Sequence, residues 1–162
     1  MATEIERKWL LEKLPAWISE KAERIFWISQ SYVVIGESGE TRVRFRRDEN
    51  SGDAEYFLTV KCGEGLVRTE IEVKIDPQQY TDLKKASIGT VEKQRFVTST
   101  NPQMEIDEYF GKLYGLYVVE IEFANQEEAE KFVAPGWFGR EVTEDKAYKN
   151  KNLALKGFPK KD

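Results

Sequence analysis

Charged residues recur at every second position along several segments of this chain, with apolar residues between them. The pattern is clearest at Arg42-Val43-Arg44-Phe45-Arg46 and from Arg68 to Lys74. Successive side chains of a β-strand point to opposite faces, so each segment predicts a strand with one charged face and one apolar face. A chain built from many such strands must cover its apolar faces and place a large number of charges.

The other strand predictions follow from the same two-residue period. The segments are 4–9, 30–35, 42–46, 58–61, 68–75, 93–96, 105–110 and 118–123. Turns rich in Gly, Ser and Asn at 37–40, 50–53 and 62–65 predict hairpins, so most neighbouring strands are expected to be antiparallel. Helix start signals at Asp76-Pro77 and at Asn125 with Glu128 predict helices over 78–86 and from 129 onward, and residues 15–21 predict a short third helix.

These elements predict one α+β domain over residues 1–162, with seven or eight antiparallel strands built around a barrel and a few flanking helices. The alternation is compatible with two arrangements. Either helices and flanking segments cover the apolar faces and the charged faces line the interior, or the charges face water as in an ordinary sandwich. Buried charge pairs do not on the whole stabilise folds, so a charged interior would require a ligand.

The amino-acid composition excludes several kinds of catalytic and metal site. The chain has no His, which excludes His general bases and His metal ligands, and a metal site would therefore be oxygen-rich and suited to Mg²⁺, Mn²⁺ or Ca²⁺. A single Cys excludes an internal disulfide, and the net charge of −4 gives no support to nucleic-acid binding. With no apolar run long enough for a membrane span and no signal-peptide pattern, we expect a cytoplasmic protein without membrane contacts.

The distribution of charge indicates what a charged interior would bind. Basic residues dominate the middle strands, and carboxylates dominate the first strand and the later ones. Arg and Lys bind polyanions, whereas clustered carboxylates bind hard cations. The combination is typical of a metal–polyphosphate site.

A set of short motifs resembles those of a known protein family. Glu4-Ile5-Glu6-Arg7-Lys8 resembles the N-terminal Glu-x-Glu-x-Lys signature of the CYTH superfamily, the triphosphate tunnel metalloenzymes. Further segments follow in the family's order, from Thr41-Arg42-Val43-Arg44 to Val142-Thr143-x-Asp145-Lys146-x-Tyr148-x-Asn150. The resemblance covers nearly the whole chain and looks closest to small bacterial-type inorganic triphosphatases. It implies an eight-stranded antiparallel barrel with a charged tunnel, acting on triphosphates with Mg²⁺ or Mn²⁺.

The resemblance and the strand parity together assign roles to residues. The metal ligands are expected to be Glu4, Glu6, Glu120 and Glu122, supported by groups behind them from among Glu70, Glu72, Glu105 and Asp107. The phosphate-binding set is Lys8, Arg42, Arg44, Lys61, Lys93, Arg95 and Lys146. The candidate catalytic groups are Lys8, Glu6 and Tyr32, although a tyrosine of ordinary pKa is a poor base. Trp9 has the opposite parity and is expected to pack outside the barrel.

The predicted reaction is hydrolysis of the terminal phosphate of a triphosphate, with inorganic triphosphate as the first choice because no segment is dedicated to recognising a base. Thiamine triphosphatase, nucleoside triphosphatase and adenylate cyclase remain alternatives, since the motifs recognise the phosphate tail alone. A non-catalytic polyphosphate-binding module would not need paired carboxylates. A barrel that binds an apolar ligand would need apolar residues on its inner face, which is the reverse of the expected arrangement. The expected partner is a small-molecule triphosphate, and the sequence leaves the oligomeric state open.

Overall fold

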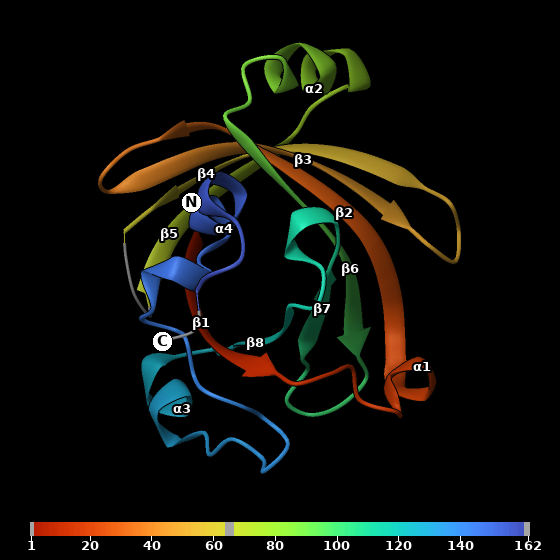
Figure 1. Cartoon of the computed structure of the whole chain (residues 1–162), viewed down its shortest axis with the longest axis vertical. Helices are drawn as coiled ribbons and strands as arrows, with labels where there is room; N and C mark the ends of the chain where they lie inside the picture. Colours follow the sequence, from red (N-terminus) through yellow and green to blue (C-terminus); the bar gives the residue numbers. More distant parts are fainter. Residues whose placement is uncertain (1, 64–66, 161–162) are drawn as a thin grey trace.

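A closed barrel of antiparallel strands forms the body of the computed structural model, which describes residues 2–63 and 67–160 (Figure 1). The strands are β1 (Ala2–Leu11), β2 (Ala22–Ile35), β3 (Gly39–Asp48), β4 (Ala54–Cys62), β5 (Val67–Lys74), β6 (Gly89–Thr98), β7 (Glu105–Tyr109) and β8 (Tyr117–Glu122). Their order around the barrel is β1-β5-β4-β3-β2-β6-β7-β8. The predicted α+β barrel is therefore confirmed, while Glu64 and Gly65 of the predicted turn at 62–65 lie outside the described residues.

Strand β2 begins at Ala22, well before the predicted start at residue 30. The sequence pattern did not reveal its first half, because the inner face there carries apolar residues instead of charges. Phe26 pairs with Arg95, and Ile28 pairs with Arg46 and Lys93, so these side chains share the interior face with the charges. Phe26, Ile28 and Val97 form a small buried apolar cluster there. The interior of the barrel is thus charged over most strands but apolar along part of β2 and β6.

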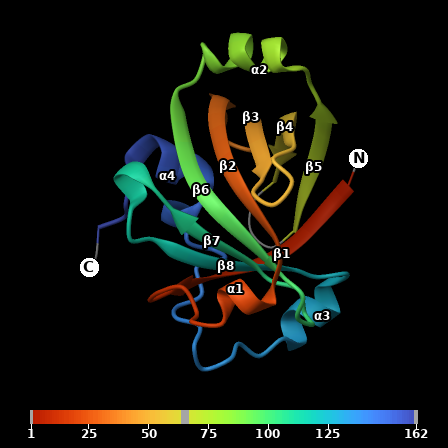
Figure 2. The same ribbon diagram turned by 90° about the vertical axis from the view of Figure 1, so that its right-hand side faces the viewer.

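The helices flank the barrel (Figure 2). They are α1 (Ile18–Lys21), α2 (Pro77–Lys84), α3 (Gln126–Lys131) and α4 (Asn150–Lys156), with 3-10 turns η1 (Gly111–Leu113) and η2 (Lys146–Tyr148). Helix α2 begins as predicted. The Asp76 carboxylate accepts a hydrogen bond from the backbone N–H of Gln79 at 2.8 Å, and the Gln79 side chain accepts one from the backbone N–H of Asp76 at 3.0 Å. Tyr80 of α2 packs on Phe45 and Tyr56 outside the barrel.

The outer faces of β1, β7 and β8 are covered by the chain that follows α3. Trp9 is 2% exposed, with its ring 5.5 Å from that of Phe132 and 5.0 Å from that of Phe138. The prediction that Trp9 packs outside the barrel is confirmed. The core on this side also includes Ile106 and Ile121, each of which lies between two charged residues of its strand and points to the opposite face.

An apolar cluster at one end of the barrel completes the frame around the interior. Leu153 and Ala154 of α4 pack with Tyr32, Val91 and Tyr109 in a second apolar cluster, which helps close one end of the barrel. No helix within the described part of the chain is long and apolar enough to cross a membrane.

The outer face of β5 departs from the expectation that apolar faces are covered. Val67, Ile71 and Val73 are 42%, 47% and 49% exposed. The two-residue period correctly gave the parity of β5, but parity does not say which face another element will cover.

Candidate active site

A cavity of about 230 Å³ lies inside the barrel and receives side chains from all eight strands. It is lined by Thr3, Glu4, Glu6, Lys8, Tyr32, Glu40, Arg42, Arg44, Lys61, Arg68, Glu70, Glu72, Arg95, Glu105, Glu120 and Glu122, together with Val142, Thr143, Lys149 and Asn150 from the C-terminal segment. Most are charged, and along each strand they stand at every second position. The alternation that marked the sequence therefore places these charges inside the barrel rather than in open water.

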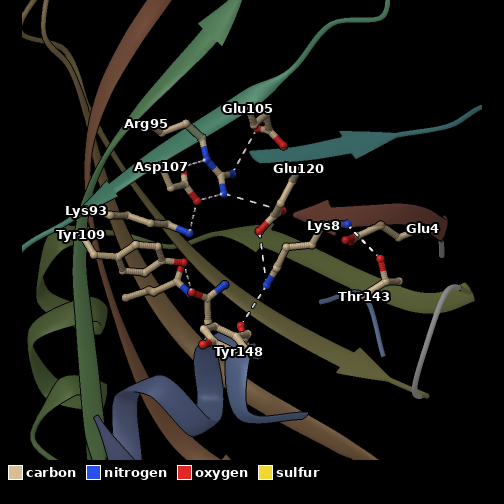
Figure 3. Close-up of polar contacts among 12 residues, drawn as sticks. Glu4, Lys8, Lys93, Arg95, Glu105, Asp107, Tyr109, Glu120, Thr143 and Tyr148 are labelled. Atoms are coloured by element: carbon tan, nitrogen blue, oxygen red, sulfur yellow. Dashed lines mark hydrogen bonds and ion pairs between the residues drawn. The ribbon is translucent and has the colours of Figure 1, made fainter. Parts of the chain in front are cut away.

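Several of these charges are paired across neighbouring strands. The ammonium of Lys61 lies 3.2 Å from the carboxylate of Glu4 and 3.4 Å from that of Glu70, its register partner on β5. Lys8 pairs with Glu120 of β8 in the same way, at 3.5 Å, and its ammonium donates to the backbone carbonyl of Tyr148 at 3.1 Å (Figure 3). Such pairs hold long side chains in fixed positions along the cavity wall.

Arg95 is held by carboxylates of β7. Its Nε and Nη2 donate to the two oxygens of Asp107, each at 2.8 Å, and Nη1 donates to Glu105 at 3.1 Å (Figure 3). Asp107 also lies 2.9 Å from the Lys93 ammonium, and both of these residues are fully buried. The bidentate contact fixes the plane of the Arg95 guanidinium at the cavity wall.

Arg42 and Arg44 lack comparable carboxylate partners. Neither forms an ion pair with a carboxylate of the described residues, and the buried Nε of Arg42 has no hydrogen-bond partner among them. Burial and the neighbouring charges of Arg42 and Arg95 lower the pKa of Arg44 to about 10. Guanidiniums crowded in this way would be stabilised by a bound anion.

The acidic side of the cavity shows the opposite imbalance. Glu6 and Glu122 are register partners on β1 and β8, and neither forms an ion pair within the described residues. Burial, with the charges of Glu120 and Glu4, raises the pKa of Glu6 to about 8. Burial and the charges of Glu4 and Glu105 raise the pKa of Glu122 to about 6. Carboxylates that repel one another in this way would be stabilised by a bound cation.

The donor set suits a hard cation, although it is not a complete cage. No group of three or more carboxylates or thiolates in residues 2–63 and 67–160 converges closely enough to hold a metal by itself. Mg²⁺ is commonly bound through one or two carboxylates together with substrate phosphates and water. The carboxylates of Glu4, Glu6, Glu120 and Glu122 therefore fit an ion that completes its coordination with a phosphate ligand.

Most of the residues selected from the sequence line this cavity, with three exceptions. Lys93 and Asp107 are completely buried and absent from its lining, so they lie behind the wall that Arg95 presents. Lys146 is exposed on η2 and is also absent from the lining, whereas Lys149 and Asn150 of the same segment line the cavity. Direct phosphate contact by Lys93 or Lys146 is therefore unsupported by the geometry. Strand parity cannot separate the cavity wall from the layer behind it, and it does not apply to a non-strand segment.

Glu40 and Arg68 form a buried ion pair at the cavity, although neither was predicted as a site residue from the sequence. Both share the parity of residues that were selected, Glu40 with Arg42 and Arg68 with Glu70, so the signal was present. Glu40 was assigned to a turn, but β3 begins at Gly39. Thr143, part of the late motif, accepts a hydrogen bond from the backbone N–H of Lys8 at 3.0 Å and ties the C-terminal segment to β1.

Tyr32 lines the cavity but is poorly suited to proton transfer. It is fully buried, and burial raises its pKa to about 12. Its hydroxyl oxygen accepts a hydrogen bond from Gln30 Nε2 at 2.9 Å. A phenolate base would therefore be scarce at neutral pH, and the geometry favours hydrogen bonding by Tyr32 over the base role.

Known proteins are similar to this chain in both sequence and fold. An inorganic triphosphatase of Nitrosomonas europaea is 40% identical over 157 residues, which cover 94% of this chain and 97% of the relative. The chain belongs to this family of inorganic triphosphatases. A second member of the inorganic triphosphatase family, from Acetivibrio thermocellus, is 31% identical over 128 residues, covering 76% of this chain and 77% of the relative.

Solved structures agree with this membership. The crystal structure of the inorganic triphosphatase NE1496 matches with a TM-score of 0.63 and 38% identity, covering 96% of each chain. The PH1819 protein of Pyrococcus horikoshii, at 24% identity over 78% of this chain and 81% of its own, has a TM-score of 0.59 and shows a shared fold. No family model matches the chain. The resemblance to the CYTH superfamily, which the sequence motifs indicated for this chain, is therefore confirmed.

Proposed function

We propose that the cavity binds inorganic triphosphate together with Mg²⁺ or Mn²⁺, and that the protein hydrolyses the terminal phosphate to give pyrophosphate and phosphate. One observation carries the proposal. Among the described residues, the same cavity contains two guanidiniums that form no ion pair, Arg42 and Arg44, and two carboxylates that form none, Glu6 and Glu122. A metal–triphosphate complex supplies both missing charges at once.

The basic residues of the wall bind and orient the phosphate chain. Arg42 and Arg44 offer forked donors that match phosphate oxygens, and Lys61 and Lys8 add point charges held in place by Glu4 and Glu120. Arg95 presents a guanidinium whose orientation Asp107 fixes. Because these groups are already positioned, little reorganisation is needed when negative charge redistributes in the transition state.

Glu4, Glu6, Glu120 and Glu122 are the residues that would hold the metal ion. When bound, the ion neutralises charge on the phosphate oxygens and lowers repulsion toward the attacking water. The water oxygen forms a bond to the terminal phosphorus, and the bond from that phosphorus to the bridging oxygen breaks. The bridging oxygen leaves with pyrophosphate, and the proton of the water passes to a cavity carboxylate and then to solvent.

The lining favours inorganic triphosphate over organic triphosphates. Tyr32 is the one aromatic side chain among the described residues that line the cavity, and it is fully buried. Stacking on a base or a thiazole ring would need an accessible aromatic face. The relatives from Nitrosomonas europaea and Acetivibrio thermocellus are both named inorganic triphosphatases, which supports the same choice of substrate.

The test is product formation from inorganic triphosphate, ATP and thiamine triphosphate, each with Mg²⁺, Mn²⁺ or a chelator. We expect phosphate and pyrophosphate from inorganic triphosphate, loss of activity in the chelator, and a decrease of about 100-fold or more in Glu6→Gln, because a charged ligand is lost from a site that works by charge neutralisation. Glu127→Gln, which alters an exposed pair with Lys131, is the matched control. Cyclic AMP from ATP would overturn the proposal, as would tight binding of triphosphate without hydrolysis.

A further inference from the structure

Gln30 is a completely buried amide on the inner face of β2, beside the cavity but outside its lining. It pairs in register with Arg44 of β3 and Val91 of β6. Its side chain makes two hydrogen bonds. Oε1 accepts from Nε of Arg44 at 3.1 Å, and Nε2 donates to the hydroxyl oxygen of Tyr32 at 2.9 Å. One amide therefore joins two groups that line the cavity.

The chemistry of the partners fixes the orientation of this amide. A guanidinium has donors and no acceptor, so the oxygen of Gln30 must face Arg44. The amide nitrogen then faces Tyr32 and can only donate to it. A rotated amide would place two donors against each other at Arg44, in a buried site where an unmade hydrogen bond is costly.

This orientation determines how Tyr32 can act. Its oxygen accepts from Gln30, and the guanidinium of Arg42 interacts with the same hydroxyl. The hydroxyl hydrogen of Tyr32 is not donated to any group in the described part of the chain. Since Tyr32 lines the cavity, that hydrogen is available to an anion bound there.

We propose that Gln30 is a positioning residue that orients Arg44 and Tyr32 as paired hydrogen-bond donors to the phosphate chain. This inference rests on the proposed function and extends it to a residue that does not itself touch the substrate. It changes the role of Tyr32 from proton acceptor to hydrogen-bond donor. It also explains a polar side chain at a buried position where Leu or Met would fill the same volume without needing partners.

The central experiment compares wild type with Gln30→Met, which keeps the length of the side chain and removes both hydrogen bonds. We measure kcat and KM for inorganic triphosphate with Mg²⁺, and the Kd of inorganic triphosphate with Ca²⁺ in place of Mg²⁺ by calorimetry. We expect KM and Kd to rise roughly tenfold, the scale of one hydrogen bond to a charged group, with kcat changing less than about threefold. Ser31→Ala is the matched control, because the buried hydroxyl of Ser31 bonds Thr90 and belongs to the opposite parity of the same strand.

A double-mutant cycle separates positioning from simple structural support. If Gln30 acts through Tyr32, the rise in Kd caused by Gln30→Met shrinks from roughly tenfold to about threefold in a Tyr32→Phe background. Equal effects in both backgrounds would overturn the role assigned to Tyr32. An unchanged Kd in Gln30→Met with a lowered Tm would show that Gln30 only supports the fold. If wild type binds triphosphate without hydrolysing it, the proposed function fails, yet the binding cycle still tests Gln30.

Discussion

Replacing Asp107 with asparagine tests whether buried charge behind the cavity wall holds the barrel together. Asp107 is 0% exposed and is the shared partner of two buried cations, Arg95 and Lys93. Asparagine keeps the shape and can still accept one hydrogen bond from Arg95. It removes the negative charge, so Lys93 loses the one carboxylate with which it pairs among the described residues, while Arg95 keeps its contact with Glu105 at 3.1 Å.

The size of the effect follows from those contacts. Removing one partner of a buried ion pair costs about 3–5 kcal/mol, because the remaining charge stays desolvated. For a protein of this size, each kcal/mol lowers Tm by about 2–4 °C, so we expect a decrease of roughly 6–20 °C. Lys93 limits the loss, since burial and the charge of Arg95 lower its pKa to about 7 and allow it to become neutral.

Thermal unfolding followed by circular dichroism at pH 7 measures this prediction. Glu127→Gln, on an exposed helix pair, should leave Tm within about 2 °C of wild type. In the double variant Asp107→Asn with Lys93→Met, part of the lost Tm should return, because the second cation is gone. A Tm decrease below about 2 °C in Asp107→Asn would refute the view that this carboxylate compensates buried charge.

Three further predictions concern stability. Because the pKa of Lys93 falls from 10.5 to about 7 on folding, the unfolded chain binds more protons between these values, and stability should rise with pH from about 7 to 9; Lys93→Met should flatten this rise in urea titrations. Gly89→Ala should lower the free energy of unfolding by about 1–3 kcal/mol, since the new Cβ would lie 2.8 Å from the carbonyl oxygen of Ala154, whereas Gly136→Ala, with open space, should not. Asp76→Ala should cost about 1 kcal/mol by removing the N-cap of α2, as measured by chemical denaturation.

Strand parity explains why so much of the barrel and its cavity could be predicted. On β1, β3 and β5, the charged residues that line the cavity stand at every second position, with uncharged residues between most of them, so the inner face of each strand could be identified from the sequence. The same logic failed for the first half of β2, where Phe26 and Ile28 put apolar side chains on the inner face. A two-residue period is visible only where the two faces differ in polarity.

Depth within the interior was not predictable from the pattern. Lys93 and Arg95 are two residues apart on one strand and look equivalent in the sequence, yet Arg95 lines the cavity and Lys93 does not. The ammonium of Lys93 lies 5.4 Å from the ring of Tyr109, and Tyr109 packs with Leu153 and Ala154 of α4 in the apolar cluster at one end of the barrel. Likewise, Lys149 rather than Lys146 lines the cavity because the segment folds into η2 and α4 instead of continuing as a strand.

The ion pairs divide the basic side chains of the cavity into those that pair with a carboxylate of the protein and those that are open to a ligand. Lys61, Lys8 and Arg95 each have a carboxylate partner, which keeps their charges compensated when the cavity holds no anion. Arg42 and Arg44 form no such ion pair among the described residues, and burial together with the charge of Arg42 lowers the pKa of Arg44, a cost that a bound anion would reduce. Binding a polyanion should therefore stabilise the fold more strongly than binding a single phosphate, because only the longer ligand would reach both these guanidiniums and a cation at the opposite carboxylates, as proposed above.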